Sequence, residues 1–353
     1  MAISPFDHPL LSGLLGDAQV ARAFSVDADL AAMLRFEVAL AQAEAEEGVI
    51  PAESAEAIAA ALRDFRPDFE ALKRGVAHDG VVGVALVAAL RDAVGGQHGR
   101  YVHFGATSQD VIDTSLALRL LTLLDGFDRR LEDLATALAA IEARDGDVAV
   151  MAHTRMQAAL PVTAARKLRA WRDPLDRHRL RLEAVRADVA VLHFGGAAGT
   201  LEKLGDKAAA VSRRLAASLG LRAVPNALHS ERDWVAALAS WLSLVTGSLG
   251  KMGVDIALMA QTELGEVKLA SGGGSSAMPH KANPVGAEML VTLARFNATL
   301  LAGVHQSLVH ENERSGAAWT LEWMLLPQMV AATGAALRTA QGLVEGLEFA
   351  RKR

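Results

Sequence analysis

The stretch of sequence that decides the fold is DWVAALASWLSLVTGSLGKMGVDIALM, residues 233–259. Large apolar side chains recur along it at intervals of three or four residues, which places them on one face of an α-helix. These residues are Trp234, Leu238, Trp241, Val245, Leu249, Met252, Ile256 and Met259. A stripe of this length predicts a long helix that packs against other long helices, within the chain or in a second copy of it.

The composition indicates an all-α protein. Of the 353 residues, 51% are hydrophobic but only 5% are aromatic, so the core is aliphatic and rich in alanine and leucine, the strongest helix formers. Only 10 prolines interrupt the chain. Because no segment has a convincing strand pattern, we expect a helical bundle with very long central helices.

Charge and cysteine content exclude several classes of protein. The formal net charge is -5 and there is no basic tract, so nucleic acid is not an expected partner. The chain has no cysteine, which excludes disulfides, zinc–thiolate sites and thiol catalysis. It has neither a signal-peptide pattern nor a continuous apolar run long enough to span a membrane, so we expect a cytoplasmic protein with no membrane partner.

Downstream of the apolar stripe lies the sequence SGGGSSAMPHKANPV, residues 271–285. Three successive glycines cannot hold a helix, because freezing each glycine backbone costs about 1 kcal/mol more than freezing alanine. The segment is therefore a mobile loop, which serves as a Gly/Ser linker or as a site rich in backbone N–H groups and hydroxyls. A plain linker does not need the residues MPHKANP, so their presence favours a functional site. Asn283 and Pro284 also fit the N-cap and first position of the next helix.

A second polar cluster, GATSQDVIDT at residues 105–114, opens another long helix. Thr107 and Asp110 have the spacing of a capping box. Thr107 and Ser108 also present hydroxyls and free N–H groups at the positive end of a helix, which is a natural anion site. Helix initiation alone and anion binding explain this segment equally well.

The third polar cluster is MAHTRMQAALP, residues 151–161. His153, Arg155 and Gln157 alternate with other residues, so they can point the same way from an extended segment. Pro161 is expected in the first turn of the next helix, where its missing N–H does no harm. All three clusters lie at predicted helix ends, and an oligomer of long helices can combine such ends from different subunits.

These motifs together resemble a known family. The sequence GSSAMPHKANP at 274–284 resembles the signature of the fumarase/aspartase superfamily, and residues 105–114 and 151–163 resemble its first two conserved blocks. The fit covers nearly the whole chain. It is nearest to the bacterial 3-carboxy-cis,cis-muconate cycloisomerase branch through FGGAAGT (194–200), LHSERD (228–233), GSLGKM (247–252), QTELGEV (261–267) and ERS (313–315).

The resemblance implies an architecture. It is an all-α, fumarase/aspartase-like long helical bundle, whose central helices form the core of a homotetramer with each active site shared by three subunits. It implies an N-terminal helical domain at residues 1–104 and a central helical-bundle domain at residues 105–353. Many relatives carry a further helical domain that would begin near residue 350, so we expect the family's C-terminal domain to be absent from this chain. No cofactor and no metal are implied.

The resemblance also implies roles for the loop and for the first block. Ser275 matches the serine that transfers the catalytic proton. Lys281 and Asn283 match residues that hold a substrate carboxylate, and Thr107 and Ser108 match carboxylate-binding hydroxyls.

Further substrate-binding positions follow from the other motifs. Gln157 matches a substrate contact in the second block. His229 and Arg314 lie in branch-specific motifs and are assigned to substrate binding. His229 and Arg232, which precede a long helix, fit ordinary surface groups equally well.

One position departs from the lyase pattern. Lyase branches have RTHxQ in the second block, whereas this chain has HTRMQ at 153–157. Arg155 therefore stands where the lyases have a catalytic histidine, and His153 lies two places earlier; we assign both to catalysis. This departure argues against an adenylosuccinate lyase, which needs that histidine as proton donor. It favours a lactonising enzyme, whose reaction has no leaving amine.

The resemblance thus implies a cofactor-independent cycloisomerase of aromatic degradation, acting on a small di- or tricarboxylate. The implied reaction converts 3-carboxy-cis,cis-muconate to 4-carboxymuconolactone through an aci-carboxylate intermediate. The alternative is a fumarate-releasing lyase similar to adenylosuccinate lyase. A non-catalytic helical scaffold is the third hypothesis.

Overall fold

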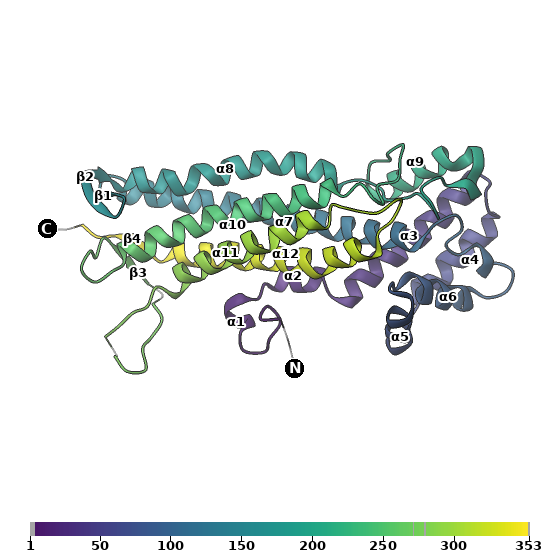
Figure 1. Ribbon diagram of the computed structural model, residues 1–353, viewed down its shortest axis with the longest axis horizontal. Coiled ribbons are helices and arrows are strands. Elements are labelled where there is room, and N and C mark those ends of the chain that lie inside the picture. The colour runs from purple at the N-terminus through teal and green to yellow at the C-terminus, as the bar shows by residue number, and fades with distance from the viewer. Residues whose placement is uncertain (1–3, 271, 279, 352–353) are drawn as a thin grey trace.

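The computed structural model describes residues 4–270, 272–278 and 280–351. It is an elongated helical bundle with a cluster of shorter helices at one end (Figure 1). In chain order the elements are α1 Ser12–Leu15, α2 Ala18–Ala23, α3 Val26–Glu46, α4 Ala52–Arg63, α5 Phe69–Asp79, α6 Gly83–Val94, a 3-10 helix Gly99–Tyr101, α7 Ser108–Asp145, β1 Ala149–Thr154, β2 Gln157–Thr163, α8 Ala164–Val189, a 3-10 helix Glu202–Lys207, α9 Ala208–Leu219, α10 Asp233–Met259, β3 Val267–Leu269, α11 Val285–Gln306, α12 Gly316–Glu345 and β4 Leu347–Phe349.

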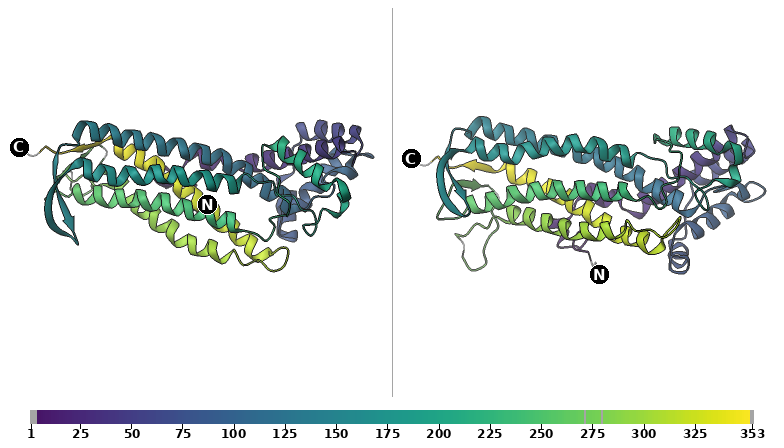
Figure 2. Two further views of the ribbon diagram at one scale, coloured as in Figure 1. Left: turned by 90° about the horizontal axis from the view of Figure 1, so that it is seen from above. Right: turned by 45° about the horizontal axis from the view of Figure 1, so that its top comes forward.

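The long helices α7, α8, α10, α11 and α12 lie side by side along the bundle (Figure 2). Helix α10 packs against α8, α11 and α12, and α7 packs against α8 and α12. All eight apolar residues of the stripe at 233–259 are buried in the bundle core. The predicted long helix and the predicted helical bundle are therefore confirmed.

Helix α7 sets the length of the bundle. It begins with the predicted capping box, in which the Thr107 N–H donates to Oδ2 of Asp110 at 3.0 Å. Its 38 residues correspond to a rod of about 57 Å at 1.5 Å per residue. Thr107 therefore lies at one end of the bundle, and the hairpin of β1 and β2 that follows Asp145 lies at the other (Figure 1).

The shorter helices have a hydrophobic core of their own. Residues of α3, α4, α6 and α9 form one buried cluster, and the bundle helices form another. Helix α7 contributes to both clusters, through Val111 to the first and through Leu120 and the residues after it to the second. The domain boundary between residues 104 and 105 stays a prediction.

The expectation that the chain has no strands is wrong at two places. Strands β1 and β2 pair as an antiparallel hairpin, and β3 pairs with β4. Pro161 lies in β2 opposite Met151, so it does not start the next helix, which begins at Ala164. Proline is tolerated there because the two-stranded ribbon has free edges that do not need its missing N–H.

Helices α10 and α11 are long and apolar enough to cross a membrane by length and composition alone. In α10, 50% of the most apolar window is buried against the rest of the chain, as is typical of a core helix. In α11 only 22% is buried, but its fully exposed positions are polar or small, and apolar residues such as Val291 and Leu300 are partly exposed.

Glu44 of α3 is a buried carboxyl group without a partner. It has no exposed surface, and neither of its carboxyl oxygens has a hydrogen-bond partner among the described residues. Burial, with a smaller contribution from the charge of Glu37, raises the pKa of Glu44 to about 9. Glu44 is therefore protonated in the folded protein at neutral pH.

This raised pKa makes the stability depend on pH. Below pH 4.5, the ordinary pKa, Glu44 is protonated in both states and its stabilising contribution is fully present. As pH rises towards 9 the unfolded state loses the proton while the folded state keeps it, so this contribution is progressively lost. Glutamine cannot ionise, so the Glu44→Gln variant lacks this pH dependence. As pH rises, we expect the free energy of unfolding of wild type to fall relative to that of the variant, by up to about 1.4 kcal/mol per pH unit.

Chemical denaturation of both proteins between pH 5 and 9 measures the difference. The exposed Glu53, replaced by Gln, is the matched control and should show no such trend. A constant difference between wild type and Glu44→Gln over this range contradicts the buried, protonated state.

Candidate active site

The predicted site residues fall into two groups at opposite ends of the bundle. Thr107, Ser108, His229 and Arg314 lie where the long helices meet the shorter ones, and the structure brings them together. The hairpin and the signature loop lie towards the other end, past the full length of α7 and α10 (Figure 1). Because α7 is about 57 Å long, one chain cannot close a small-molecule site from both groups.

Asp110 organises the first group. It is fully buried and accepts hydrogen bonds at both oxygens. Oδ1 accepts from the Gly195 N–H at 2.9 Å and from Nε2 of His229 at 2.6 Å. Oδ2 accepts from the Gly196 N–H at 2.9 Å and from the Thr107 N–H at 3.0 Å. One carboxylate therefore ties the start of α7 to the glycine-rich segment at 195–196 and to His229.

Arg314 is oriented in the same group. Its Nε donates to Oε1 of Gln109 at 2.8 Å, and its Nη2 lies 3.4 Å from both the Ala197 carbonyl and Nδ1 of His229. Gln109 is itself fixed, because its Nε2 donates to Oδ2 of Asp113 at 3.1 Å and to the His229 carbonyl at 2.8 Å. The guanidinium is thus held beside a helix start that carries two hydroxyls, an arrangement suited to a carboxylate.

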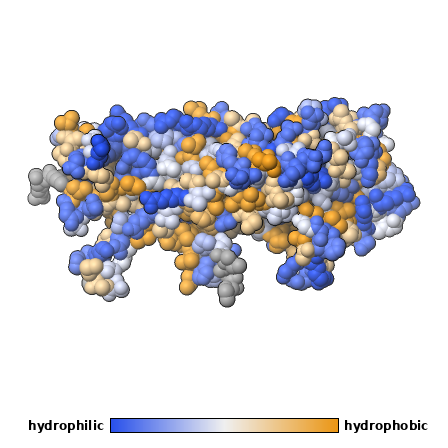
Figure 3. All heavy atoms as spheres, in the orientation of Figure 1, coloured by the Kyte–Doolittle hydropathy of each residue, from blue (hydrophilic) through white to orange (hydrophobic). Residues whose placement is uncertain are grey.

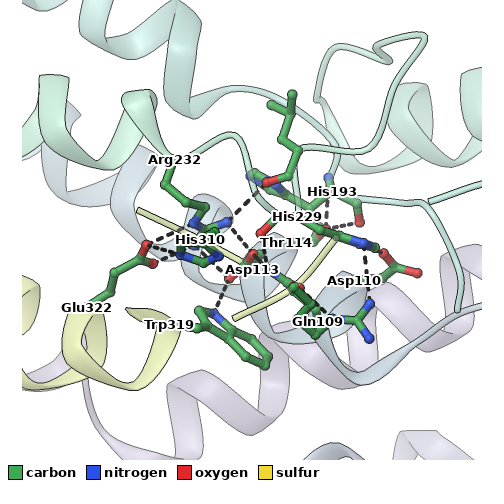
Figure 4. Close-up of polar contacts among 12 residues, drawn as sticks. Gln109, Asp110, Asp113, Thr114, His193, His229, Arg232, His310, Trp319 and Glu322 are labelled. Carbon is green, nitrogen blue, oxygen red and sulfur yellow. Dashed lines mark hydrogen bonds and ion pairs between the residues drawn. The ribbon is translucent and has the colours of Figure 1, made fainter. Parts of the chain in front are cut away.

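A buried ion cluster lies beside this group, which it contacts through Asp113 and Gln109 (Figure 4). The Arg232 side chain has no exposed surface and contacts Oδ2 of Asp113 and Oε2 of Glu322, each at 2.6 Å. Trp319 Nε1 donates to Oδ1 of Asp113 at 3.0 Å. The alternative that Arg232 and His229 are ordinary surface groups is therefore wrong, because both are buried.

The two acids of this cluster differ in their pKa. Burial alone raises the pKa of Asp113, but the charge of Arg232 reverses the effect and holds it below its usual range. Burial also raises the pKa of Glu322, and hydrogen bonding to Arg232 offsets only part of that increase. Asp113 is therefore the firmly ionised partner of Arg232, while Glu322 takes up a proton more readily.

The second group includes the tip of the β1–β2 hairpin. Thr154 pairs with Gln157, so Arg155 and Met156 form a two-residue turn. Both have a left-handed backbone, with φ of 49° and 66°, as a type I′ turn requires. His153, Arg155 and Gln157 are exposed in the single chain, and the expectation that all three point the same way from one extended segment is wrong, since the chain reverses at Arg155.

The hairpin tip borders a cleft of about 670 Å³ at the ends of α8 and α10. Arg155 and Lys167 supply cations to it, and His153 lines it as well. Non-glycine residues adopt positive φ at a cost of about 1 kcal/mol or more. Arg155 is therefore held at the tip in spite of backbone strain.

The signature loop is the segment at 271–285, and a pair of backbone hydrogen bonds closes its base. Gly273 and Asn283 exchange two backbone hydrogen bonds of 2.8 Å, and the Asn283 side chain donates to the Gly274 carbonyl at 3.2 Å. An added Cβ would meet Ala282 at 2.7 Å from position 272 and Val285 at 2.5 Å from position 273. These two glycines therefore permit close packing, a role different from the predicted loop mobility.

Within the loop, the Ser275 hydroxyl accepts from the N–H groups of Ala277 and Met278 at 3.4 and 3.1 Å. Lys281 is exposed. Asn283 does not cap α11, because Pro284 occupies the N-cap position. Ser271 and Pro279, which belong to the predicted loop at 271–285, lie outside the described residues.

Sequence reasoning missed the central role of Asp110. It identified Asp110 as a helix-capping residue, which is correct, but the partners at 195, 196 and 229 are far away in the chain. No local pattern reports such contacts. A buried carboxylate needs several donors, and the Gly-Gly pair and the histidine are the donors that long-range folding supplies.

Comparisons with known proteins agree with this architecture. The family described as "Lyase" matches residues 17–298. A 3-carboxy-cis,cis-muconate cycloisomerase of Pseudomonas aeruginosa is 43% identical over 336 residues, covering 94% of this chain and 73% of that protein. The corresponding enzyme of Bradyrhizobium diazoefficiens is 39% identical, covering 96% of this chain and 77% of that protein.

A solved structure is similar throughout. The 3-carboxy-cis,cis-muconate lactonizing enzyme from Pseudomonas putida has a TM-score of 0.92 and 40% sequence identity, covering 98% of this chain and 78% of that chain. The predicted resemblance to the fumarase/aspartase superfamily and its cycloisomerase branch is confirmed.

We expect Arg232→Met to destabilise the protein by about 3–5 kcal/mol, because it leaves Asp113 and Glu322 buried without their shared cation. Equilibrium unfolding measures the loss. Arg351→Met is the matched control, since it removes an exposed pair with Asp147 and should cost at most about 1 kcal/mol. Equal losses for the two variants contradict a stabilising role for the buried cluster.

Proposed function

We propose, from the premise that this chain belongs to the lyase family, that it is a cycloisomerase of aromatic degradation. Its substrate is 3-carboxy-cis,cis-muconate and its product is 4-carboxymuconolactone. The observation that carries the proposal is the similarity to cycloisomerases over nearly the whole chain, together with Arg155 at the position of the lyase histidine. We place the enzyme in the cytoplasm.

The reaction is an internal addition. One carboxylate oxygen of the substrate bonds to an alkene carbon, and the π electrons move onto a neighbouring carboxylate to give the aci-carboxylate. A proton then goes to carbon, so the product is an isomer of the substrate. The protein must therefore bind several carboxylates, stabilise the developing charge and supply one proton.

Ser275 is the proton donor in this scheme. Because its hydroxyl oxygen accepts from the N–H groups of Ala277 and Met278, its own hydrogen remains free to be donated. The same N–H groups stabilise the alkoxide that remains. Backbone N–H groups of residues 272–276 support the aci-carboxylate, except that of Gly273, which donates to the Asn283 carbonyl. Each well-placed donor contributes about 3–4 kcal/mol.

Cations from both ends of the bundle bind the carboxylates. Arg314, beside Thr107 and Ser108, holds one of them, and Arg155 and Lys281 hold others. Gln157, His229 and Asn283 complete the polar contacts, and His153 acts beside Arg155 in catalysis.

A single chain does not complete such a site, so the enzyme acts as a homotetramer in which different subunits supply the two ends. Helix α11 supports this, since only 22% of its most apolar window is buried and apolar residues such as Val291 and Leu300 are partly exposed. Large exposed apolar side chains on α10 and α12 support it too, among them Leu244 and Met324. Apolar patches lie along the bundle surface (Figure 3), and burying them in a second copy is favourable.

We expect purified protein without added cofactor to remove the ultraviolet absorbance of 3-carboxy-cis,cis-muconate, because lactone formation breaks the conjugated diene. Ser275→Ala should lower kcat by about 10²–10³-fold without changing the oligomer, because it removes the proton donor. Ser276→Ala, one residue along the loop, is the control and should keep most activity.

Other outcomes discriminate the alternatives. Fumarate release from adenylosuccinate without any muconate turnover favours the lyase hypothesis. Turnover of neither substrate favours the scaffold. A muconate-active enzyme with full activity in Ser275→Ala contradicts the role of the serine alone.

A further inference from the structure

Asp110 makes a contact that helix capping does not require. A capping box needs only the bond between its carboxylate and the Thr107 N–H. Here the other oxygen also receives a 2.6 Å contact from Nε2 of His229, a residue that is 2% exposed. The two side chains come from positions 119 residues apart, so the pairing is a product of the tertiary fold.

The neighbours of His229 fix its tautomer. A guanidinium can only donate hydrogen bonds, so Nδ1 of His229, 3.4 Å from Nη2 of Arg314, must be an unprotonated acceptor. The ring hydrogen then belongs to Nε2, which donates it to Oδ1 of Asp110. The imidazole therefore links the buried carboxylate of Asp110 to Arg314, so the position of the carboxylate determines the orientation of the guanidinium.

Arg314 depends on this orientation. Its Nε and Nη2 are engaged within the protein, by Gln109, the Ala197 carbonyl and His229. Nη1 makes no hydrogen bond within the described residues, so it is the nitrogen left to bind a ligand. If Nδ1 of His229 carried a hydrogen, it would be a donor in place of an acceptor. It would then repel Nη2 of Arg314 and rotate the guanidinium away from the hydroxyls at the start of α7.

We propose that Asp110 is a positioning residue that acts through His229 to hold Arg314 in the orientation that binds a substrate carboxylate. This inference rests on the proposed function, since Arg314 is the carboxylate-binding cation of that scheme. It also revises the role of His229, which orients the arginine and does not itself bind substrate.

Paired substitutions of His229 test the proposal. In His229→Gln the amide NH₂ can donate to Asp110 and the amide oxygen can accept from Arg314, so we expect kcat/KM within about tenfold of wild type. His229→Leu fills the space without either hydrogen bond, and we expect a loss of about 100-fold in kcat/KM, mainly through KM. Equal losses in the two variants overturn the proposal.

A double-mutant cycle shows whether His229 acts through Arg314. In an Arg314→Gln background, His229→Leu should cause little further loss, because the group that it orients is already gone. If the fold losses in kcat/KM of the two single variants multiply in the double variant, the proposal is overturned, since His229 then acts independently of Arg314. His178→Leu is the control for burial, because His178 is also buried but bonds to Ser248 in mid-bundle; any effect of this change on stability should leave KM unchanged.

A spectroscopic measurement is independent of turnover. In protein labelled with ¹⁵N-histidine, the His229 signals, identified by their absence from His229→Gln, should show a protonated Nε2 and an unprotonated Nδ1. In Asp110→Asn the amide NH₂ at the Oδ1 position would reverse this tautomer. A protonated Nδ1 in wild type overturns the proposal even when the enzyme is active. The expected wild-type signals in a protein without muconate turnover would instead mean that the proposed function fails while the positioning contact stands.

Discussion

The length of the apolar helices is the constraint on which the rest of the structure depends. Helices α7 and α10 have 38 and 27 residues, which correspond to rods of about 57 and 40 Å. Apolar stripes bury these helices along the bundle core, so they cannot bend to bring their ends together. Chemistry placed at helix ends is therefore divided, and in the proposed homotetramer another copy of the chain supplies the missing half.

The two halves are held by different physical means. At the end with Arg314, fully buried carboxylates and Arg232 form a polar cluster in which charge compensates charge, and this fixes the start of α7 against α10 and α12. At the other end the residues lie on an exposed hairpin tip and on a loop closed by two backbone hydrogen bonds. In the proposed oligomer, this division combines a rigid surface that binds a substrate carboxylate with a second surface that gains its full set of contacts on assembly.

Sequence periodicity predicted the bundle because helix burial follows a local repeat. The spacing from Trp234 to Met259 and the Thr107–Asp110 capping box both depend on neighbours within a few residues, and both are confirmed. The hairpin at Arg155 and Met156 was missed because its turn lacks the Asn-Gly or Asp-Gly pair that usually marks positive φ. The pairing of Asp110 with His229, and the backbone hydrogen bonds between Gly273 and Asn283, depend on distant or non-helical contacts that no periodicity encodes.

The most direct test of the divided site is the activity of mixed oligomers made from two inactive variants, Arg314→Gln and Ser275→Ala. If one active site takes these residues from different chains, an equal random mixture contains some sites with both residues intact, about one quarter of the total. We predict that subunit exchange between the variants restores activity towards that fraction, measured as loss of muconate absorbance. If both residues of a site come from one chain, every site carries one defect. No recovery, in a preparation where identically treated wild type regains its activity, would contradict the account.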